Sequence, residues 1–424
     1  MQLRSYLKRV ALLAAAGGTV GGFLAPTMSS ASAASTAPTA PTAMANLNLA
    51  LVGSDTVFCV DKAITTRYNK AVANTTGNHV FNVPPIGGVN LGCSKTPLTY
   101  AIPGDSTHGR LTFANPAVPP TTGAPPGNGH VCAQPLGQVP KPWEYPDGSG
   151  LGITCYTDDN GAGHLAMTRS SRGRASTDPA GLQFWADAMD ALSWSSNSSH
   201  APASLNATQI HNILNCNIRT WGKVNGHPND TTPINVFYPQ TGSGTGSFFA
   251  TLFNGGTYPT PSSCIPASHF VEENTGTQVH AANAFYPYSF ALHKAQTDGA
   301  ETNVTNGFKL GKISGTAPSL TSISEAAAKV NVTGDACNAP KGGQFCATRY
   351  VYHTVWHKVP AAEYNAAISL IGVPASGNPG AHSVCSNTYA QQLKRFGFKP
   401  LQKAKTGQST SSNPVPGQSF CRQF

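Results

Sequence analysis

Charge is scarce in this 424-residue sequence, because Asp, Glu, Lys and Arg together make up only 11% of it. The basic residues are not clustered among aromatic ones, which excludes a typical nucleic-acid-binding surface. Basic residues still outnumber acidic ones, and the net charge of +9 gives a weak general attraction for anions. Glycine and proline are abundant, so the composition is typical of a loop-rich α/β protein that works outside the cytoplasm.

Long apolar runs are missing beyond the N-terminus. There, basic residues precede an apolar run that begins at Val10, and a small-residue cleavage site follows at Ala31–Ala33. We therefore predict a signal peptide over residues 1–33 and a flexible leader over residues 34–43. No later segment has the roughly 18 consecutive apolar residues of a membrane helix, and no cysteine at the cleavage site is placed to carry a lipid. The predicted protein is secreted, with no lipid anchor evident.

The sequence has no Cys-x2-Cys pair, the spacing typical of a zinc site, so we expect neither a metal nor another cofactor. It has ten cysteines, and an even number in a secreted chain predicts disulfides. They fall into three sets along the chain: Cys59, Cys93, Cys132 and Cys155; then Cys216 and Cys264; then Cys337, Cys346, Cys385 and Cys421. If each bridge closes within a set, the favoured pairs are Cys216–Cys264 and Cys337–Cys346.

A glycine-rich turn, Gly242–Thr245, separates a strand-like run at Ile234–Phe237 from a helix-like run at Ser247–Leu252. The glycines at 242, 244 and 246 permit positive φ and close approach of a ligand, while Ser243 and Thr245 add hydroxyl donors. A helix start also offers N–H groups and partial positive charge. The turn therefore indicates a site for a phosphate-like oxyanion. The alternative for this turn alone is an ordinary helix cap on a surface loop.

Three more Ser- or Thr-rich turns follow strand-like runs. A strand predicted for Ala45–Val52 ends at Gly53–Thr56, and a helix is predicted for Val57–Tyr68. A second turn lies within Tyr145–Ile153, and a third run, His164–Arg174, ends in hydroxyls and arginines. Ligands of open α/β sheets bind outside the carboxyl ends of strands, so we expect these turns to converge on one site.

The order of these turns resembles that of the periplasmic phosphate-binding proteins, the solute-binding components of phosphate ABC importers, and especially their secreted actinobacterial relatives. The resemblance runs from about Leu47 to about Leu401. It is carried by Gly53–Thr56, Asp147–Gly150, Thr168–Gly173, Ala203–Ile213 with Cys216 and Trp221, and Pro239–Thr245. It implies an α/β, two-lobed Venus-flytrap fold with a dehydrated phosphate in the cleft between the lobes.

By that resemblance, residues 44–194 and 348–424 would form the first lobe, and residues 195–347 the second. The chain would capture a small oxyanion as a monomer, without chemistry, and hand it to a membrane ABC permease; no nucleic acid is expected as a partner. The predicted ligand-binding residues are Asp55, Thr56, Ser149, Gly150, Ser170, Ser171, Arg172, Gly242, Ser243, Gly244 and Thr245.

The sequence departs from this family at charged positions. Family members that bind phosphate tightly have an arginine and a carboxylate where this chain has Pro239 and Thr241, and an aspartate where it has Ser171. A carboxylate repels fully ionised anions such as sulfate, so its loss should relax selectivity. Because a guanidinium pairs strongly with oxyanions, we predict that Arg172 supplies the cationic contact.

Two other functions stay open. A secreted hydrolase would need a base for Ser243, and His200, His211 and His280 are candidates, but the turn is not the Gly-x-Ser-x-Gly elbow of such enzymes. The second open function is that of a secreted interaction or structural protein on an emptied solute-binding fold. It is favoured by the missing charged residues, the absent lipid anchor and the Pro- and Gly-rich stretch from Val83 to Pro146.

Overall fold

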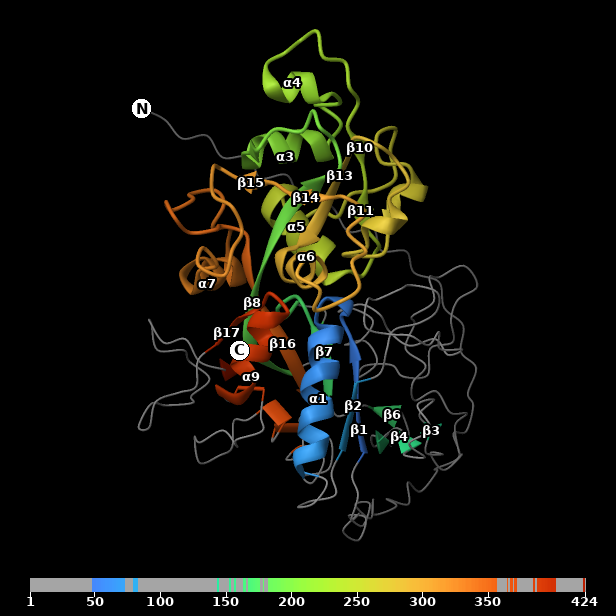
Figure 1. Cartoon of the computed structure of the whole chain (residues 1–424), viewed down its shortest axis with the longest axis vertical. Coiled ribbons are helices and arrows are strands. Elements are labelled where there is room, and N and C mark those ends of the chain that lie inside the picture. The colour runs from blue at the N-terminus through green and yellow to red at the C-terminus, as the bar shows by residue number, and fades with distance from the viewer. Residues whose placement is uncertain are drawn as a thin grey trace, which may run out of the picture. The chain divides into compact units, whose positions relative to one another are not determined.

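One long strand, β8 (Leu182–Ser196), joins two regions of the main sheet (Figure 1). Nine of its first ten residues pair antiparallel with β16 (Thr348–Trp356), with Asp187 skipped at a bulge, and its last five pair antiparallel with β13 (Ala284–Ser289). Almost every β8 residue is buried, as expected of a strand that is covered on both faces. The predicted lobe boundary between residues 194 and 195 thus falls inside one continuous strand; the division into lobes stays a prediction.

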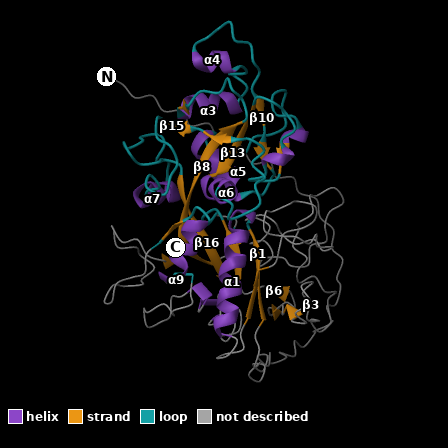
Figure 2. Ribbon diagram, in the orientation of Figure 1, coloured by secondary structure: helices purple, strands orange, loops and turns teal. Residues whose placement is uncertain are grey.

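The computed structural model describes residues 48–72, 79–82, 143–144, 152–153, 156–157, 163–164, 167–175, 178, 182–356, 364, 367–368, 370–371, 384–385, 387–401 and 422–423. They belong to one compact unit, Met44–Phe424. Strands and helices alternate within it, which confirms the predicted α/β class (Figure 2). In the part of the chain that the structure describes, no helix is long and apolar enough to cross a membrane.

The main sheet has the strand order β10-β13-β8-β16-β7-β1-β2, and β14, β17 and β18 also pair with β8. The other strands of this sheet are β1 (Asn48–Gly53), β2 (His79–Asn82), β7 (Met167–Ser170), β10 (Asn235–Val236), β14 (Lys309–Leu310), β17 (Lys399–Pro400) and β18 (Arg422–Gln423). Four two-stranded sheets are formed by β3 (Trp143–Glu144) with β4 (Gly152–Ile153), β5 (Tyr156–Thr157) with β6 (Gly163–His164), β9 (Ser204–Leu205) with β15 (Lys312–Ile313), and β11 (Tyr238–Pro239) with β12 (Phe270–Val271).

The described helices are α1 (Phe58–Val72), α3 (Ala207–Leu214), α4 (Trp221–Asn225), α5 (Gly244–Phe253), α6 (Phe290–Thr297), α7 (Glu325–Thr333) and α9 (Asn387–Arg395). Helix α1 buries Val60, Ile64 and Tyr68, which recur every four residues on one face, and this confirms the helix predicted after the first strand. It packs against β2 and α9, whereas α5 and α6 pack against β13, and α7 packs against β16.

The core is rich in large aromatic side chains. Trp194 on β8 stacks on Phe285 of β13, with ring centroids 6.2 Å apart, and Trp221 also packs against it, with ring centroids 6.1 Å apart. A Cβ atom on Gly311 would lie 2.0 Å from the Trp194 ring, so only glycine fits there. The predicted disulfides Cys216–Cys264 and Cys337–Cys346 are both formed.

Candidate functional site

Two of the predicted turns meet because their strands are parallel neighbours. Strand β1 pairs with β7 in a register that places Gly53 beside Arg169, so the residues that follow each strand emerge at one edge of the sheet. There the Ser54 hydroxyl donates a hydrogen bond to the Ser171 hydroxyl over 2.9 Å, and both side chains are fully buried. The predicted convergence of these two turns is therefore present in the fold.

The Arg169 side chain holds the backbone at this edge of the sheet. Its buried guanidinium donates to three backbone carbonyls of the β1 end, those of Leu51 (2.5 Å), Gly53 (2.8 Å) and Ser54 (3.2 Å). These hydrogen bonds satisfy carbonyls that the end of a strand would otherwise leave unpaired. Arg169 thus holds the turn that presents Thr56.

The glycine-rich turn caps helix α5. Gly242 has φ of 94°, as predicted, and the Ser243 hydroxyl accepts the Gly246 backbone N–H over 3.0 Å. The prediction of positive φ at Gly244 and Gly246 was wrong, because the helix begins at Gly244, three residues earlier than expected. Gly246 is needed for packing instead, since a Cβ atom there would lie 2.3 Å from the Tyr258 hydroxyl.

The two regions meet at a pair of buried threonines. The Thr56 and Thr245 hydroxyls lie 3.3 Å apart, although 189 positions separate them in the sequence. Arg349 on β16 contacts the same place, because its guanidinium donates to the Thr245 hydroxyl (3.2 Å) and to the Ser171 carbonyl (2.9 Å). Asp190, opposite Arg349 on β8, pairs with this guanidinium at 2.8 Å and fixes its direction.

A carboxylate already lies at the predicted anion-binding donors. Glu273 accepts hydrogen bonds from the Ser243 hydroxyl, the Thr245 backbone N–H (3.2 Å) and the Thr56 hydroxyl (2.8 Å). We call these three donor residues, Thr56, Ser243 and Thr245, the cradle. All three side chains and Glu273 are buried. A hydrogen-bonded carboxylate presents two oxygens, so the cradle has the geometry to hold an oxyanion.

The pKa of Asp55 depends on the other acidic residues near the cradle. Burial raises the pKa of Asp55 well above its ordinary value, and the nearby charges of Glu272 and Glu273 raise it further, while Arg169 lowers it. Asp55 Oδ1 is buried and has no hydrogen-bond partner. These conditions favour a protonated Asp55. Among the described residues, no group of three or more His, Cys, Asp or Glu side chains is placed to hold a metal ion.

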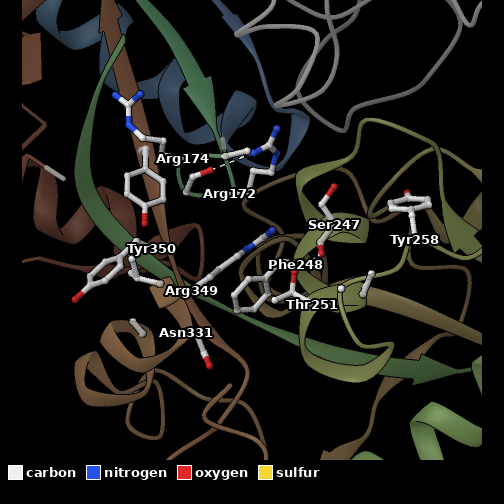
Figure 3. A pocket seen from close by; sticks show the side chains of 16 residues that line it. Arg172, Arg174, Ser247, Phe248, Thr251, Tyr258, Asn331, Arg349 and Tyr350 are labelled. Atoms are coloured by element: carbon white, nitrogen blue, oxygen red, sulfur yellow. Dashed lines mark hydrogen bonds between the residues drawn. The ribbon is translucent and has the colours of Figure 1, made fainter. Parts of the chain in front are cut away.

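A pocket of about 400 Å³ opens beside the cradle (Figure 3). Arg172 lies in its wall, where its guanidinium donates to the Gly173 carbonyl (3.2 Å) and approaches the Asp178 carboxylate at 3.8 Å. The pocket is lined by Arg172, Gly173, Arg174, Ala175, Ser247, Phe248, Ala250, Thr251, Gly256, Tyr258, Ala328, Asn331, Val332, Arg349, Tyr350 and Tyr352. Arg349 is the side chain that the pocket shares with the cradle contacts.

The structure brings together some of the predicted ligand-binding residues. Thr56, Ser243 and Thr245 form the cradle, Ser171 is linked to it through Arg349, and Gly242 and Gly244 shape its turn. Asp55 lies beside it, next to Glu272 and Glu273. The Ser170 hydroxyl instead donates to the Arg172 carbonyl within its own turn, and Arg172 lies in the pocket wall. Ser149 and Gly150 lie outside the described residues.

Sequence reasoning missed Glu273, Arg349 and Asp190. Glu272 and Glu273 are adjacent acids directly after the short strand β12, which is a detectable signal in a chain with so few charges. Arg349 gave no comparable signal, because it is a single charge near the start of a strand, between Thr348 and Tyr350. Its role arises only when β16 pairs with β8 and brings Asp190 opposite it.

No family model and no curated protein matches this sequence. Solved structures match its fold at low identity. A Clostridium perfringens protein with bound phosphate, assigned to a phosphate ABC transporter as substrate-binding protein, has TM-score 0.47 and 12% identity, covering 84% of this chain and 100% of its own. An ABC-type phosphate transport receptor of Vibrio cholerae has TM-score 0.46 and 16% identity, covering 83% of this chain and 99% of its own. A phosphate-binding protein of Stenotrophomonas maltophilia has TM-score 0.42 and 14% identity, covering 85% of this chain and 91% of its own. Each TM-score lies below one half, so a function for this chain has to be inferred from its own side chains.

Proposed function

We propose that this chain is an extracytoplasmic solute-binding protein that captures a small phosphate-like oxyanion in the cradle, without chemistry. The observation that carries this proposal is the Glu273 carboxylate, which accepts hydrogen bonds from Thr56, Ser243 and Thr245. These donors come from two distant turns and are fixed and shielded from water. They are of the kinds that bind phosphate at helix starts, namely hydroxyls and a backbone N–H.

A bound oxyanion takes the place of the Glu273 carboxylate at these donors. Two anions at contact distance in a buried site repel strongly, so Glu273 and the ligand exclude each other. Arg349 stabilises the ligand's charge from the β16 side, because its guanidinium already donates to Thr245. By the family resemblance, the filled protein would then deliver its ligand to a membrane ABC permease.

The positive charge expected from the family is supplied here by another element. The sequence has Pro239, Thr241 and Ser171 where an arginine and two carboxylates were expected. Arg349 brings a guanidinium to the same turns from β16, whereas the Glu273 carboxylate, from the loop after β12, occupies the donors that the ligand needs. The Arg349 guanidinium supports oxyanion binding. Arg349 therefore takes the place of Arg172 as the proposed cationic contact at the cradle.

Calorimetry on the mature protein tests the proposal with phosphate, arsenate and sulfate. We expect at least one of these anions to bind, and Ser243→Ala to weaken it about tenfold through loss of one charge-assisted hydrogen bond. Ser268→Ala, which removes an exposed serine hydroxyl elsewhere in the same region, is the matched control and should bind as the wild type does. If no anion binds, or if both variants behave alike, the proposal is wrong.

A secreted interaction or structural protein is the second candidate. It is favoured by one specific observation, that Glu273 already accepts hydrogen bonds from all three cradle residues. In that case the cradle would be a structural network that joins the two regions of the sheet. A thermal-shift screen with phosphate, sulfate, arsenate and phosphorylated small molecules would then show no stabilisation of the wild-type protein by any of them.

The contacts of Ser243 argue against a hydrolase in which His200 or His211 is the base. Its hydroxyl donates to Glu273, whereas His200 Nδ1 lies 2.9 Å from Asp230 and His211 Nδ1 lies 3.1 Å from the Phe253 carbonyl. A nucleophilic serine needs its base within hydrogen-bond reach. Turnover of a chromogenic phosphate or carboxylate ester by the pure protein would contradict binding without chemistry.

A further inference from the structure

The pocket beside the cradle is lined by segments from distant parts of the chain (Figure 3). The turn after β7 supplies Arg172 and Arg174, and one face of α5 supplies Phe248 and Thr251. The loop after α5, helix α7 and the start of β16 supply the rest of the lining. A cavity of about 400 Å³ falls in the size range that accommodates small organic molecules, and it is far larger than an inorganic tetraoxyanion needs.

Three arginines line this pocket and no lining residue is acidic. Arg349 is almost fully buried, at 2% exposure, the Arg172 side chain is 15% exposed, and Arg174 is exposed. The guanidinium groups thus extend from the interior to the solvent. Asp190 pairs with Arg349 and Asp178 approaches Arg172, whereas Arg174 lies over the Phe184 ring at 5.1 Å. These contacts hold the guanidinium groups in place.

Aromatic side chains form much of the remaining surface. Phe248, Tyr350 and Tyr352 are buried against the protein, and Tyr258 is partly buried. The Tyr258 hydroxyl lies 2.6 Å from each of two backbone carbonyls that can accept its single proton, and the Tyr350 hydroxyl lies 3.4 Å from the Glu325 carboxylate. Rings tethered in this way are rigid surfaces on which a flat group can pack at little entropic cost.

We propose that this pocket binds an organic phosphomonoester that carries an aromatic ring. The phosphoryl group of this ligand would lie at Arg172 and Arg174, and its ring against Phe248 and Tyr350. The guanidinium is the side chain best suited to a phosphoryl group, because it can donate two parallel hydrogen bonds. The pocket shares Arg349 with the contacts of the cradle but none of the three cradle residues. It is a second site, and it does not depend on the function proposed for the cradle.

Phenylphosphonate, a non-hydrolysable probe, tests the proposal by calorimetry on the full mature chain. We expect it to bind about tenfold more tightly than methylphosphonate, which has the same head group and no ring. Arg174→Gln should weaken phenylphosphonate about tenfold through loss of a charged donor. Arg395→Gln, the same change at an exposed arginine on α9, should leave its affinity unchanged.

The outcomes separate this site from the cradle. Because Arg174 is not a cradle residue, Arg174→Gln should lower the affinity for phenylphosphonate and leave the response to inorganic phosphate as it was. The pocket proposal is overturned if wild-type protein does not bind phenylphosphonate, or if Arg174→Gln and Arg395→Gln bind it equally well. Benzoate binding as tightly as phenylphosphonate would also overturn it, by showing that the pocket does not select a phosphoryl group.

Discussion

At the scale of single residues, Glu273 decides how easily a ligand enters the cradle. Its carboxylate accepts hydrogen bonds from the same three donors that the proposed ligand needs, so it competes with that ligand. Glu273→Gln keeps the shape and removes the charge. We expect this variant to bind phosphate about tenfold more tightly than wild type in calorimetry, because a neutral amide is the weaker acceptor and repels no anion.

The neighbouring acid provides a control for that variant. Glu272 accepts a hydrogen bond from the Gln240 side chain (2.5 Å), and it contacts Asp55 rather than the cradle donors. Glu272→Gln also removes one negative charge from this region, so it should improve affinity less than Glu273→Gln does. Weaker phosphate binding by Glu273→Gln than by wild type would show that the carboxylate helps to hold the ligand, and would contradict competition.

Arg349 and Asp190 form a buried ion pair with many other contacts. Asp190 also accepts hydrogen bonds from the Ser289 hydroxyl (2.8 Å) and the Ala291 backbone N–H (3.0 Å). Arg349→Met leaves this carboxylate buried without its cation. We expect a loss of about 3–5 kcal/mol in the free energy of unfolding, measured by urea denaturation. The double variant Arg349→Met with Asp190→Leu should lose less than the sum of the two single changes, since neither charge is then stranded.

At the scale of elements, the start of α5 depends on a glycine for packing as well as for its turn. A Cβ atom at Gly246 would lie 2.3 Å from the Tyr258 hydroxyl, and that hydroxyl is held by two backbone carbonyls. Gly246→Ala should therefore lower the unfolding free energy by about 1–3 kcal/mol despite the better helix propensity of alanine. Ser247→Ala, one residue later in the same helix, is the control and should not destabilise it. Equal stability of Gly246→Ala and wild type would contradict the clash.

Some elements of the fold could be predicted from the sequence and others could not. Local patterns predicted the first strand and helix and the turns at Thr56 and Thr245, because capping, periodicity and turn chemistry depend on neighbouring residues. The two disulfides were predicted from the even grouping of the cysteines along a secreted chain. The adjacent acids Glu272 and Glu273 were a local signal, but the contact of Glu273 with Thr56 could not be predicted from a local pattern, since it spans 217 positions. Arg349 was missed for the same reason, because its role depends on which strands pair. Charge at a buried site can come from any element that the fold brings there.

At the scale of the whole unit, one buried histidine ties together three elements of the main sheet region. His353 on β16 pairs with Asp187 on β8 through Nδ1, and its Nε2 lies 3.3 Å from Asp61 on α1. Burial alone lowers the pKa of His353, but the charges of Asp61 and Asp187 outweigh it and raise the pKa to about 10. A cation between two carboxylates is therefore part of the folded state at neutral pH.

The sign of the resulting pH dependence follows from linkage. The folded protein holds the His353 proton more tightly than the unfolded chain, whose pKa is near 6.5. This stabilisation is fully present below pH 6.5 and is lost as the pH rises through about 10. We expect the unfolding free energy to fall across this window, with a slope of at most about 1.4 kcal/mol per pH unit from this group.

Urea denaturation at a series of pH values, compared between wild type and His353→Gln, measures that contribution. The variant should be less stable at pH 6.5, because Asp61 and Asp187 are then buried without a cation between them. Its stability should also fall less steeply than that of wild type above this pH, since no proton is left to lose at position 353. Parallel curves would show that His353 is not charged in the folded state, and the three elements would then be joined by packing and neutral hydrogen bonds alone.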